Sequence, residues 1–598
     1  MVVLGISAYY HDSSAVILEN GIIKAAVQEE RFTRLKHDKA FPKNAIIACL
    51  NITHLDINQI DAIVFYDKPF LKFERLLQTY MEEAPKGWWQ FVRAMPAWLK
   101  EKLFIKDQLK KELKEIGDIN WEKTKLHFSK HHLSHAASAF FPSPFQKAAI
   151  LTVDGVGEWA TASIALGKDN NITTLKEIHF PHSLGLLYSA FTYFLGFKVN
   201  SGEYKVMGLA PYGNRESDLV KQYTHKIKTH LIEIYDDGSF KLNQEYFAYA
   251  TSFKMINESK FEQLFGLKTR KEESTLTKEH YSLAAALQIV TEEVIIKMAK
   301  EAKNITKAEN LCLSGGVALN CVANGVLEEL NFYENIFIQP AAGDAGGALG
   351  AALAYYYMAA KNERKIIFPD AMSYAYLGAS FSNTEIERAL ANNNLMWNLF
   401  DDEGLIEFTK NSLLQNKVVG WFQGKMEYGP RALGNRSILG NPLHAETQSK
   451  LNLKVKKRES FRPFAPIMLK EEFQKYFGKN YDSPYMLMVH KILKEYRKDF
   501  EINSDNLTDL INKERSEIPA ITHVDYSARI QTVTAESNKK IFDLLTAFKK
   551  ETGIGVLVNT SFNVRSEPIV CTPQDAINCF LNTDIDILVL GNYVVEKA

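Results

Sequence analysis

The chain opens with short apolar runs separated by polar turns. GISAY is apolar, HDSS is a polar loop, and AVILENGIIKAAVQ contains two apolar runs joined by Glu19-Asn20-Gly21. Asn-Gly between alternating apolar runs is a strong hairpin signal. The pattern predicts a strand followed by a β-hairpin.

The same order of elements returns about 140 residues later, which suggests duplication of one α/β unit. AAILTVDGVGE and TASIALGKDNNITTLKEIHF predict a strand, a glycine-containing loop, a strand, a turn and a strand. Two such units, each with a loop that grips phosphate, are typical of the actin-like ATPase superfamily. Strand-turn-strand patterns are common, so the repeat alone leaves other folds open.

Two longer segments predict helices. SLGLLYSAFTYFLGF (Ser183 to Phe197) is apolar but too short for a membrane span, so a buried helix is expected. Residues 97–126 carry apolar positions among mixed charges, which predicts a solvated amphipathic helix. This helix falls in an expected insertion at about residues 80–126.

A shift in composition around 360–380 places a domain boundary near residue 375. After it, strand-like runs (VVGWF, IPAITHV, GIGVLVNTSF, ILVLG) alternate with helical ones (IEFTKNSLLQ, ESNKKIFDLLTAFKKET). The sequence therefore predicts an α/β fold in two domains, residues 1–375 and 376–598.

Composition excludes some classes of function. Lys plus Arg and Asp plus Glu both number 71, and a dedicated nucleic-acid binder usually has a basic excess. The five cysteines form no CxxC pair, which fits reduced thiols in the cytoplasm. The N-terminus resembles no signal peptide. We expect a cytoplasmic protein without nucleic-acid or membrane partners.

His131 and His135 stand four residues apart, so on a helix both rings share one face. Asp154 and Asp344 each follow an apolar strand-like run. Two imidazoles and two carboxylates are a plausible set for a divalent ion that also holds phosphate oxygens. The nitrogen ligands favour Fe²⁺, Mn²⁺ or Zn²⁺ over Mg²⁺. Histidines of the surface or core remain the alternative.

Three glycine loops lie between predicted strands and the elements that follow them. They contain Gly155, the pair Gly315 and Gly316, and the set Gly343, Gly346 and Gly347. Such loops let backbone N–H groups approach phosphate closely. None fits the P-loop or dinucleotide pattern.

Other candidates are polar residues in loops. His11 and His37 can shuttle protons near neutral pH, or can be ordinary surface histidines. In the second domain, arginines stand among glycines and prolines in YGPRALGNRS and KKRESFRPFAP. Arginines so placed suggest anion clamps, with scattered surface ion pairs as the alternative.

Several long motifs resemble one family over essentially the whole chain. HHLSHAASAF, SGEYKVMGLAPYG, LSGGVALN, GDAGGALGAA, YGPRALGNRSILGNP and SFRPFAP look like the O-carbamoyltransferases of the nodulation and antibiotic-tailoring type. The resemblance implies a duplicated actin-like, Kae1-like domain followed by a YrdC-like domain. It also implies that the second domain makes carbamoyl adenylate from carbamoyl phosphate and ATP. The first would then pass the carbamoyl group to a hydroxyl.

The resemblance implies a role for each matching residue. His131, His135, Asp154 and Asp344 would hold a divalent metal, Fe²⁺ foremost with Mn²⁺ or Mg²⁺ as alternatives. The nucleotide would meet Gly155, Lys205, Gly208, Gly315, Gly316 and Asn320. Carbamoyl phosphate and ATP would be bound by Arg431, Lys456, Arg462, Arg529, Asn559 and Ser561. His11 and His37 are the expected catalytic residues.

The acceptor cannot be read from these motifs. A sugar, antibiotic or oligosaccharide hydroxyl is expected, and the enzyme could form a homodimer. Threonylcarbamoyl or carbamoyl transfer to tRNA or protein is a rival, although the neutral charge speaks against a tRNA-binding face. An ATP-responsive binding protein is a second rival, but it leaves the cationic loops unexplained.

Overall fold

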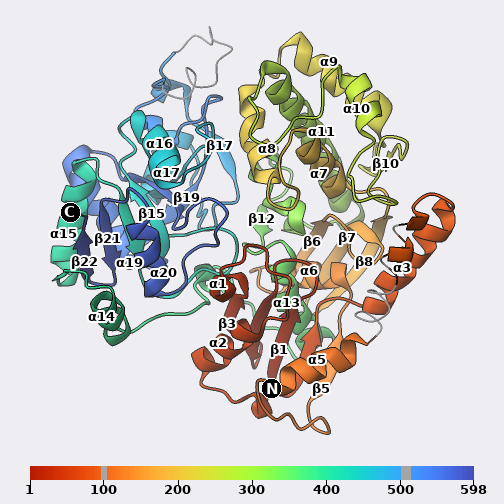
Figure 1. Cartoon of the computed structure of the whole chain (residues 1–598), viewed down its shortest axis with the longest axis horizontal. Coiled ribbons are helices and arrows are strands. Elements are labelled where there is room, and N and C mark those ends of the chain that lie inside the picture. Colours follow the sequence, from red (N-terminus) through yellow and green to blue (C-terminus); the bar gives the residue numbers. More distant parts are fainter. Residues whose placement is uncertain (90, 94, 96–103, 500–512, 598) are drawn as a thin grey trace. The chain divides into compact units, whose positions relative to one another are not determined.

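The structure is a computed structural model that describes residues 1–89, 91–93, 95, 104–499 and 513–597 (Figure 1). The chain forms two compact units. The first contains Met1–Glu29 and His37–Met372, and the second contains Glu30–Lys36 and Ser373–Ala598. A seven-residue piece near the N-terminus therefore belongs to the unit that is built mainly from the C-terminal part.

The first unit begins with a five-stranded sheet in the order β3-β2-β1-β4-β5. Strand β1 pairs antiparallel with β2 and parallel with β4. The predicted hairpin is present, and Asn20 (φ 51°) and Gly21 (φ 81°) take the left-handed conformation that such a turn needs. The strands are β1 (Val2–Ser7), β2 (Ser14–Glu19), β3 (Ile22–Gln28), β4 (Ala62–Phe65) and β5 (Lys125–Phe128).

A second five-stranded sheet in this unit repeats the arrangement. Its order is β12-β11-β6-β7-β8, with β6 antiparallel to β7 and parallel to β11. Both sheets thus consist of three antiparallel strands followed by two parallel ones, which confirms the predicted duplication. The strands are β6 (Lys147–Val153), β7 (Ala160–Lys168), β8 (Asn171–His179), β11 (Asn310–Ser314) and β12 (Asn335–Ile338).

Two helices, α6 (His131–Phe140) and α13 (Asp344–Ala354), pack against each other between these sheets. Their backbones approach closely at Gly350, where an added Cβ would lie 1.6 Å from the carbonyl oxygen of Ser134. Helix α7 (Leu184–Phe194) is the buried helix expected from the apolar run. No helix in the described part of the chain is long and apolar enough to cross a bilayer.

The expected helix over residues 97–126 is wrong in its extent. Its stretch 97–103 lies outside the described residues, together with part of the expected insertion. The described portion forms α5 (Ile105–Lys114), a turn and then β5. Leu109 and Leu113 of α5 are fully buried, so the helix packs against the unit on one face.

The second unit is built on an eight-stranded mixed sheet, in the order β13-β22-β21-β14-β15-β20-β16-β19. Hydrophobic clusters cover it, one around Phe422, Phe473 and Phe562 and another around Trp421 and Phe548. The strands are β13 (Asn398–Leu399), β14 (Val419–Phe422), β15 (Arg436–Gly440), β16 (Ala465–Leu469), β19 (Gln531–Val533), β20 (Val556–Ser561), β21 (Ile587–Leu590) and β22 (Tyr593–Glu596).

The predicted helices of this unit are present as α15 (Asp402–Leu414) and α19 (Lys539–Thr552). The expected strand IPAITHV is wrong, because Pro519–Ile521 form a 3-10 turn. Its apolar side chains are buried, but proline cannot donate to a strand ladder. The α/β fold class is otherwise confirmed.

Strand register brings several loops to one edge of this sheet. Phe422, at the end of β14, lies opposite Arg436 at the start of β15, and Ser437 lies opposite Ser561 at the end of β20. The loops beyond these residues therefore meet at the same edge.

Candidate functional site

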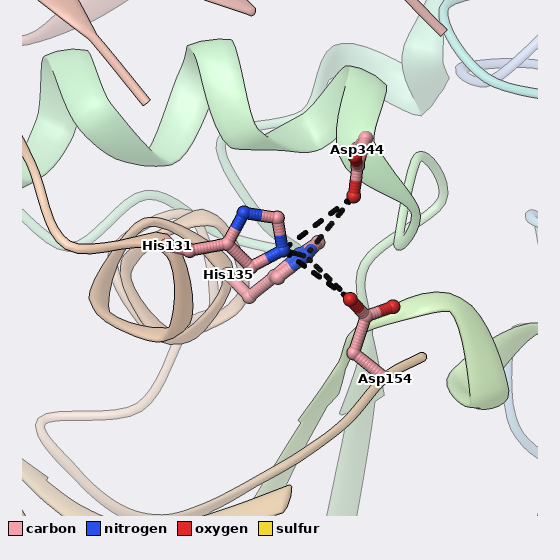
Figure 2. Close-up of side chains that lie close together, drawn as sticks. All are labelled: His131, His135, Asp154 and Asp344. Carbon is pink, nitrogen blue, oxygen red and sulfur yellow. Dashed lines mark hydrogen bonds and ion pairs between the residues drawn. The ribbon is translucent and has the colours of Figure 1, made fainter. Parts of the chain in front are cut away.

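Four side chains of the first unit converge on one point (Figure 2). His131 and His135 come from the first two turns of α6, and their Nε2 atoms lie 3.1 Å apart. Asp154 follows β6 and Asp344 begins α13. The Nε2 of His131 lies 3.2 Å from Oδ2 of Asp154 and 3.6 Å from Oδ1 of Asp344. The Nε2 of His135 lies 3.8 and 3.6 Å from the same oxygens.

Neighbouring groups fix the orientation of this His–Asp cluster (His131, His135, Asp154 and Asp344). The backbone N–H of Gly316 donates to Oδ1 of Asp154 at 2.8 Å, and the hydroxyl of Tyr66 donates to Oδ2 of Asp344 at 3.3 Å. The buried carboxylate of Glu158 accepts the backbone N–H of His131 at 2.9 Å. A carboxylate at this helix N-terminus satisfies an exposed donor and stabilises the turn that presents His131.

The electrostatics of the His–Asp cluster favour positive charge at its centre. Burial alone would lower the pKa of His131, but the carboxylates of Asp344 and Asp154 raise it to about 9. Burial would raise the pKa of both carboxyls, yet the nearby imidazoles hold those pKa values below their ordinary range. All four side chains are buried, so water screens these interactions little. The cluster has the charge and donor types of a cation site.

His11 and His37 meet through one carboxylate. Asp12 contacts Nδ1 of His11 at 3.0 Å through Oδ2 and Nδ1 of His37 at 2.8 Å through Oδ1. These three side chains form a histidine relay (His11, Asp12 and His37). The Nε2 of His11 lies 3.7 Å from Oδ2 of Asp344, so the relay reaches the His–Asp cluster. Asp12 and His37 adopt positive φ angles of 52° and 58°. Such backbone strain in non-glycine residues is concentrated at functional sites.

The predicted nucleotide-contacting residues fall into two groups. Gly155 and Gly316 flank the His–Asp cluster. Gly315 (φ 85°) passes so close to Val153 that an added Cβ would lie 2.3 Å from its carbonyl oxygen. These three glycines form the loops expected beside the cluster. Asn320, by contrast, uses its amide to cap the next helix, α12 (Cys321–Glu329), and to pair with Gln288.

Lys205 and Gly208 do not lie in a loop. Both belong to helix α8 (Glu203–Leu209), and the Lys205 ammonium lies 5.4 Å from the ring centroid of Phe197. Met207 of this helix contacts Cys321 at the start of α12. Helix α8 therefore packs beside the element that follows the Gly315-Gly316 loop.

The predicted anion-binding residues of the second unit gather at the shared sheet edge. Arg462 lies within electrostatic range of Arg431 and Lys456, and Arg458 lies within range of Arg462 and Arg529. Burial, and then the neighbouring cations, lower the pKa of Lys456 well below its ordinary value. This cationic cluster consists of Arg431, Lys456, Arg458, Arg462 and Arg529.

Two of the predicted anion-binding residues use their donors within the protein. The Asn559 amide nitrogen donates to the Ala432 carbonyl at 3.0 Å and to Oε1 of Gln531 at 2.8 Å, which uses both of its hydrogens. The Lys456 ammonium contacts the oxygens of Ser561 and Asn563. Both side chains therefore hold the loops around the cationic cluster.

Some residues of these sites were not predicted from the sequence as site residues. Arg458 stands in the same KKRESFRP motif as Lys456 and Arg462, so the motif itself was the available signal. Asp12 adjoins His11, and Glu158 closes the glycine loop that starts at Asp154. Tyr66 has no sequence signal, because only its contact with Asp344 indicates a role.

Comparison with known proteins assigns the chain to a family. Residues 2–353 match the family model described as carbamoyltransferase N-terminus, and residues 410–597 match the carbamoyltransferase C-terminus. The chain belongs to the carbamoyltransferase family. This membership confirms the resemblance expected from the motifs and identifies the protein as an enzyme that transfers carbamoyl groups.

Similar proteins include sll1178 of Synechocystis sp., 53% identical over 100% of this chain and 97% of that one. Nodulation protein NolNO of Sinorhizobium fredii is 34% identical over 99% of this chain and 80% of its own. The 3'-hydroxymethylcephem-O-carbamoyltransferase of Amycolatopsis lactamdurans is 32% identical over 53% of this chain and 54% of its own. This carbamoyltransferase is thus similar to proteins of the nodulation and cephem-tailoring type.

Proposed function

We propose that this carbamoyltransferase makes carbamoyl adenylate in its second unit and transfers the carbamoyl group to a small-molecule or glycan hydroxyl in its first unit. The observation that carries the proposal is the presence of two chemically different sites. One is the buried His–Asp cluster with its glycine loops and histidine relay. The other is the cationic cluster at the sheet edge of the second unit.

The cationic cluster suits the two anionic substrates of the first step. Water hydrolyses carbamoyl phosphate to carbamate and phosphate, a carbamate oxygen then attacks the α-phosphorus of ATP, and pyrophosphate leaves. Guanidinium groups such as those of Arg431 and Arg462 can bind phosphate oxygens bidentately. Burial lowers the pKa of Arg462, the nearby Glu459 opposes this shift, and Arg431 lowers the pKa further. A bound phosphate would offset the repulsion between the two guanidinium groups.

The His–Asp cluster fits a divalent metal. It offers two imidazole nitrogens and two carboxylate oxygens, and all of these atoms lie within 4.8 Å of one another. Nitrogen donors favour Fe²⁺ or Mn²⁺ over Mg²⁺. A divalent ion held by these residues would supply Lewis-acid stabilisation to phosphate oxygens of the adenylate.

The first-unit residues have separate tasks in the transfer step. Backbone N–H groups of the loops at Gly155 and Gly315 would bind phosphate oxygens, while the Gly316 N–H donates to Asp154 and orients that carboxylate. The histidine relay would take the proton of the acceptor hydroxyl as its oxygen attacks the carbonyl carbon and AMP leaves. Asp12 holds both imidazoles and so fixes their tautomers, which is the usual task of a carboxylate between histidines.

Mass spectrometry tests this proposal. The purified enzyme is incubated with ATP, carbamoyl phosphate and each of Fe²⁺, Mn²⁺ and Mg²⁺, alone and with a panel of hydroxylated metabolites. We expect phosphate and pyrophosphate release, carbamoyl adenylate, and one panel compound heavier by one carbamoyl group. Absence of pyrophosphate with every metal would exclude the adenylate route. Carbamoylation of added tRNA or protein alone would identify a macromolecular acceptor instead.

A further inference from the structure

The segment Glu30–Lys36 is part of the second unit although it lies between β3 and the helix α2 (Lys43–Thr53) of the first. Two arginines bind it to loops of that unit. The Arg31 guanidinium, in a side chain only 2% exposed, donates to the Gly429 carbonyl at 2.6 Å. Arg34 donates to the carbonyls of Pro568 and Ile569 at 2.7 Å each.

The loop that Arg31 contacts is the one that carries Arg431. Its two ends are fixed by Glu427, whose buried carboxylate accepts the backbone N–H groups of Leu433, Asn435 and Arg436 at 2.8, 2.9 and 3.2 Å. Gly429 bends the chain with a φ of 120°, a conformation that glycine tolerates and other residues rarely adopt. Glu427 therefore closes the base of the loop.

The outer part of the loop is held at two carbonyls on either side of Arg431. The Gly429 carbonyl accepts from Arg31, and the Ala432 carbonyl accepts from Asn559. Phe32, the neighbour of Arg31, packs against the small hydrophobic cluster that contains Ala432. The segment Glu30–Lys36 thus supplies one of these two backbone contacts.

We propose that Arg31 is a positioning residue that keeps Arg431 in place within the cationic cluster of the second unit, an inference that rests on the function proposed above. Arg431 lies within electrostatic range of Arg462, and because like charges repel, contacts of the loop backbone help to keep the two guanidinium groups together. The charge-assisted bond from a buried guanidinium is a strong hydrogen bond. Loss of the Gly429 hold would let Arg431 move away from the position that a phosphate group requires.

Carbamoyl-phosphate-dependent exchange of labelled pyrophosphate into ATP measures the first step alone. For Arg31→Met we expect the KM for carbamoyl phosphate to rise roughly tenfold to a hundredfold, because a misplacement of about 1 Å can cost this much. Arg31→Lys, which keeps a cation and one possible donor, should recover part of the loss. Lys24→Met, an exposed cation of β3, is the matched control and should keep the wild-type KM.

A double-mutant cycle distinguishes positioning from general support of the fold. If Arg31 acts through Arg431, Arg31→Met should weaken carbamoyl phosphate use no further in an Arg431→Met background. Additive losses, or a folded Arg31→Met variant with the wild-type KM, would overturn the inference. If the wild-type enzyme shows no exchange at all, the proposed adenylate step fails. The inference about Arg31 then fails with it, but for that separately recognisable reason.

Discussion

His131 and His135 direct their Nε2 atoms toward the same two carboxylate oxygens, although neither carboxylate is near them in the sequence. Four ligand atoms so close together repel one another unless a proton or a metal cation lies between them. The raised pKa of His131 and the lowered pKa of Asp154 are two signs of this demand for positive charge. The cluster is therefore best tested by its affinity for metal rather than by activity alone.

Replacement of one imidazole should remove the metal and leave the second unit intact. For His131→Ala we expect metal affinity to fall by about two orders of magnitude, at least as much as loss of a group that orients a ligand. Carbamoylation of the acceptor should be lost, while carbamoyl adenylate still forms. Metal content after dialysis and pyrophosphate release measure the two effects.

The exposed His179 offers a matched control, since its ring pairs with Glu177 at the surface, 3.1 Å away. His179→Ala should keep both metal content and transfer. Loss of adenylate formation in a folded His131→Ala variant would contradict the assignment of the two steps to two sites.

At the scale of elements, helices α6 and α13 together build the His–Asp cluster. Helix α6 carries both histidines, and Asp344 is the first residue of α13. Their spacing depends on Gly350, where the backbone of α6 leaves no room for a side chain. The geometry of the cluster is thus coupled to the packing of two helices.

We expect Gly350→Ala to destabilise the protein by about 1–3 kcal/mol or more, as overpacking of a tight contact does. An added methyl group must push α6 and α13 apart, which separates Asp344 from the imidazoles and weakens metal binding. Chemical denaturation and metal content measure both effects. Gly343→Ala is the control, because its added Cβ meets nothing within 4 Å. Equal stability of the two variants would argue against the tight helix contact.

At the scale of the whole molecule, sequence patterns predicted what depends on local spacing. The two histidines were predicted as a pair because a helix places residues four apart on one face, and the duplicated sheets because strand order followed repeated hairpin signals. The use of the Asn559 amide hydrogens by Ala432 and Gln531 was not predicted, because no motif encodes these contacts.

The hold of Arg31 on Gly429 could not be predicted for the same reason. The two residues are 398 positions apart, and Arg31 lies in a stretch whose neighbours belong to the other unit. Sequence periodicity reports which face of an element is apolar, but not which distant loop an individual guanidinium will reach. Contacts of this kind decide how loops are held, so the structure was needed to find them.

Two sites in one chain imply that each chemical step can be removed separately. Arg462→Ala should block adenylate formation, because charge-assisted hydrogen bonds to a substrate phosphate contribute roughly 1.5–3 kcal/mol each. The same variant supplied with chemically prepared carbamoyl adenylate should still carbamoylate the acceptor, since its His–Asp cluster is unchanged. His131→Ala should fail with that compound.

The exposed Arg388 provides the control, and Arg388→Ala should perform both steps. Failure of Arg462→Ala with supplied adenylate, in a folded protein, would mean that the cationic cluster also takes part in transfer, and the division of labour between the two units would have to be abandoned.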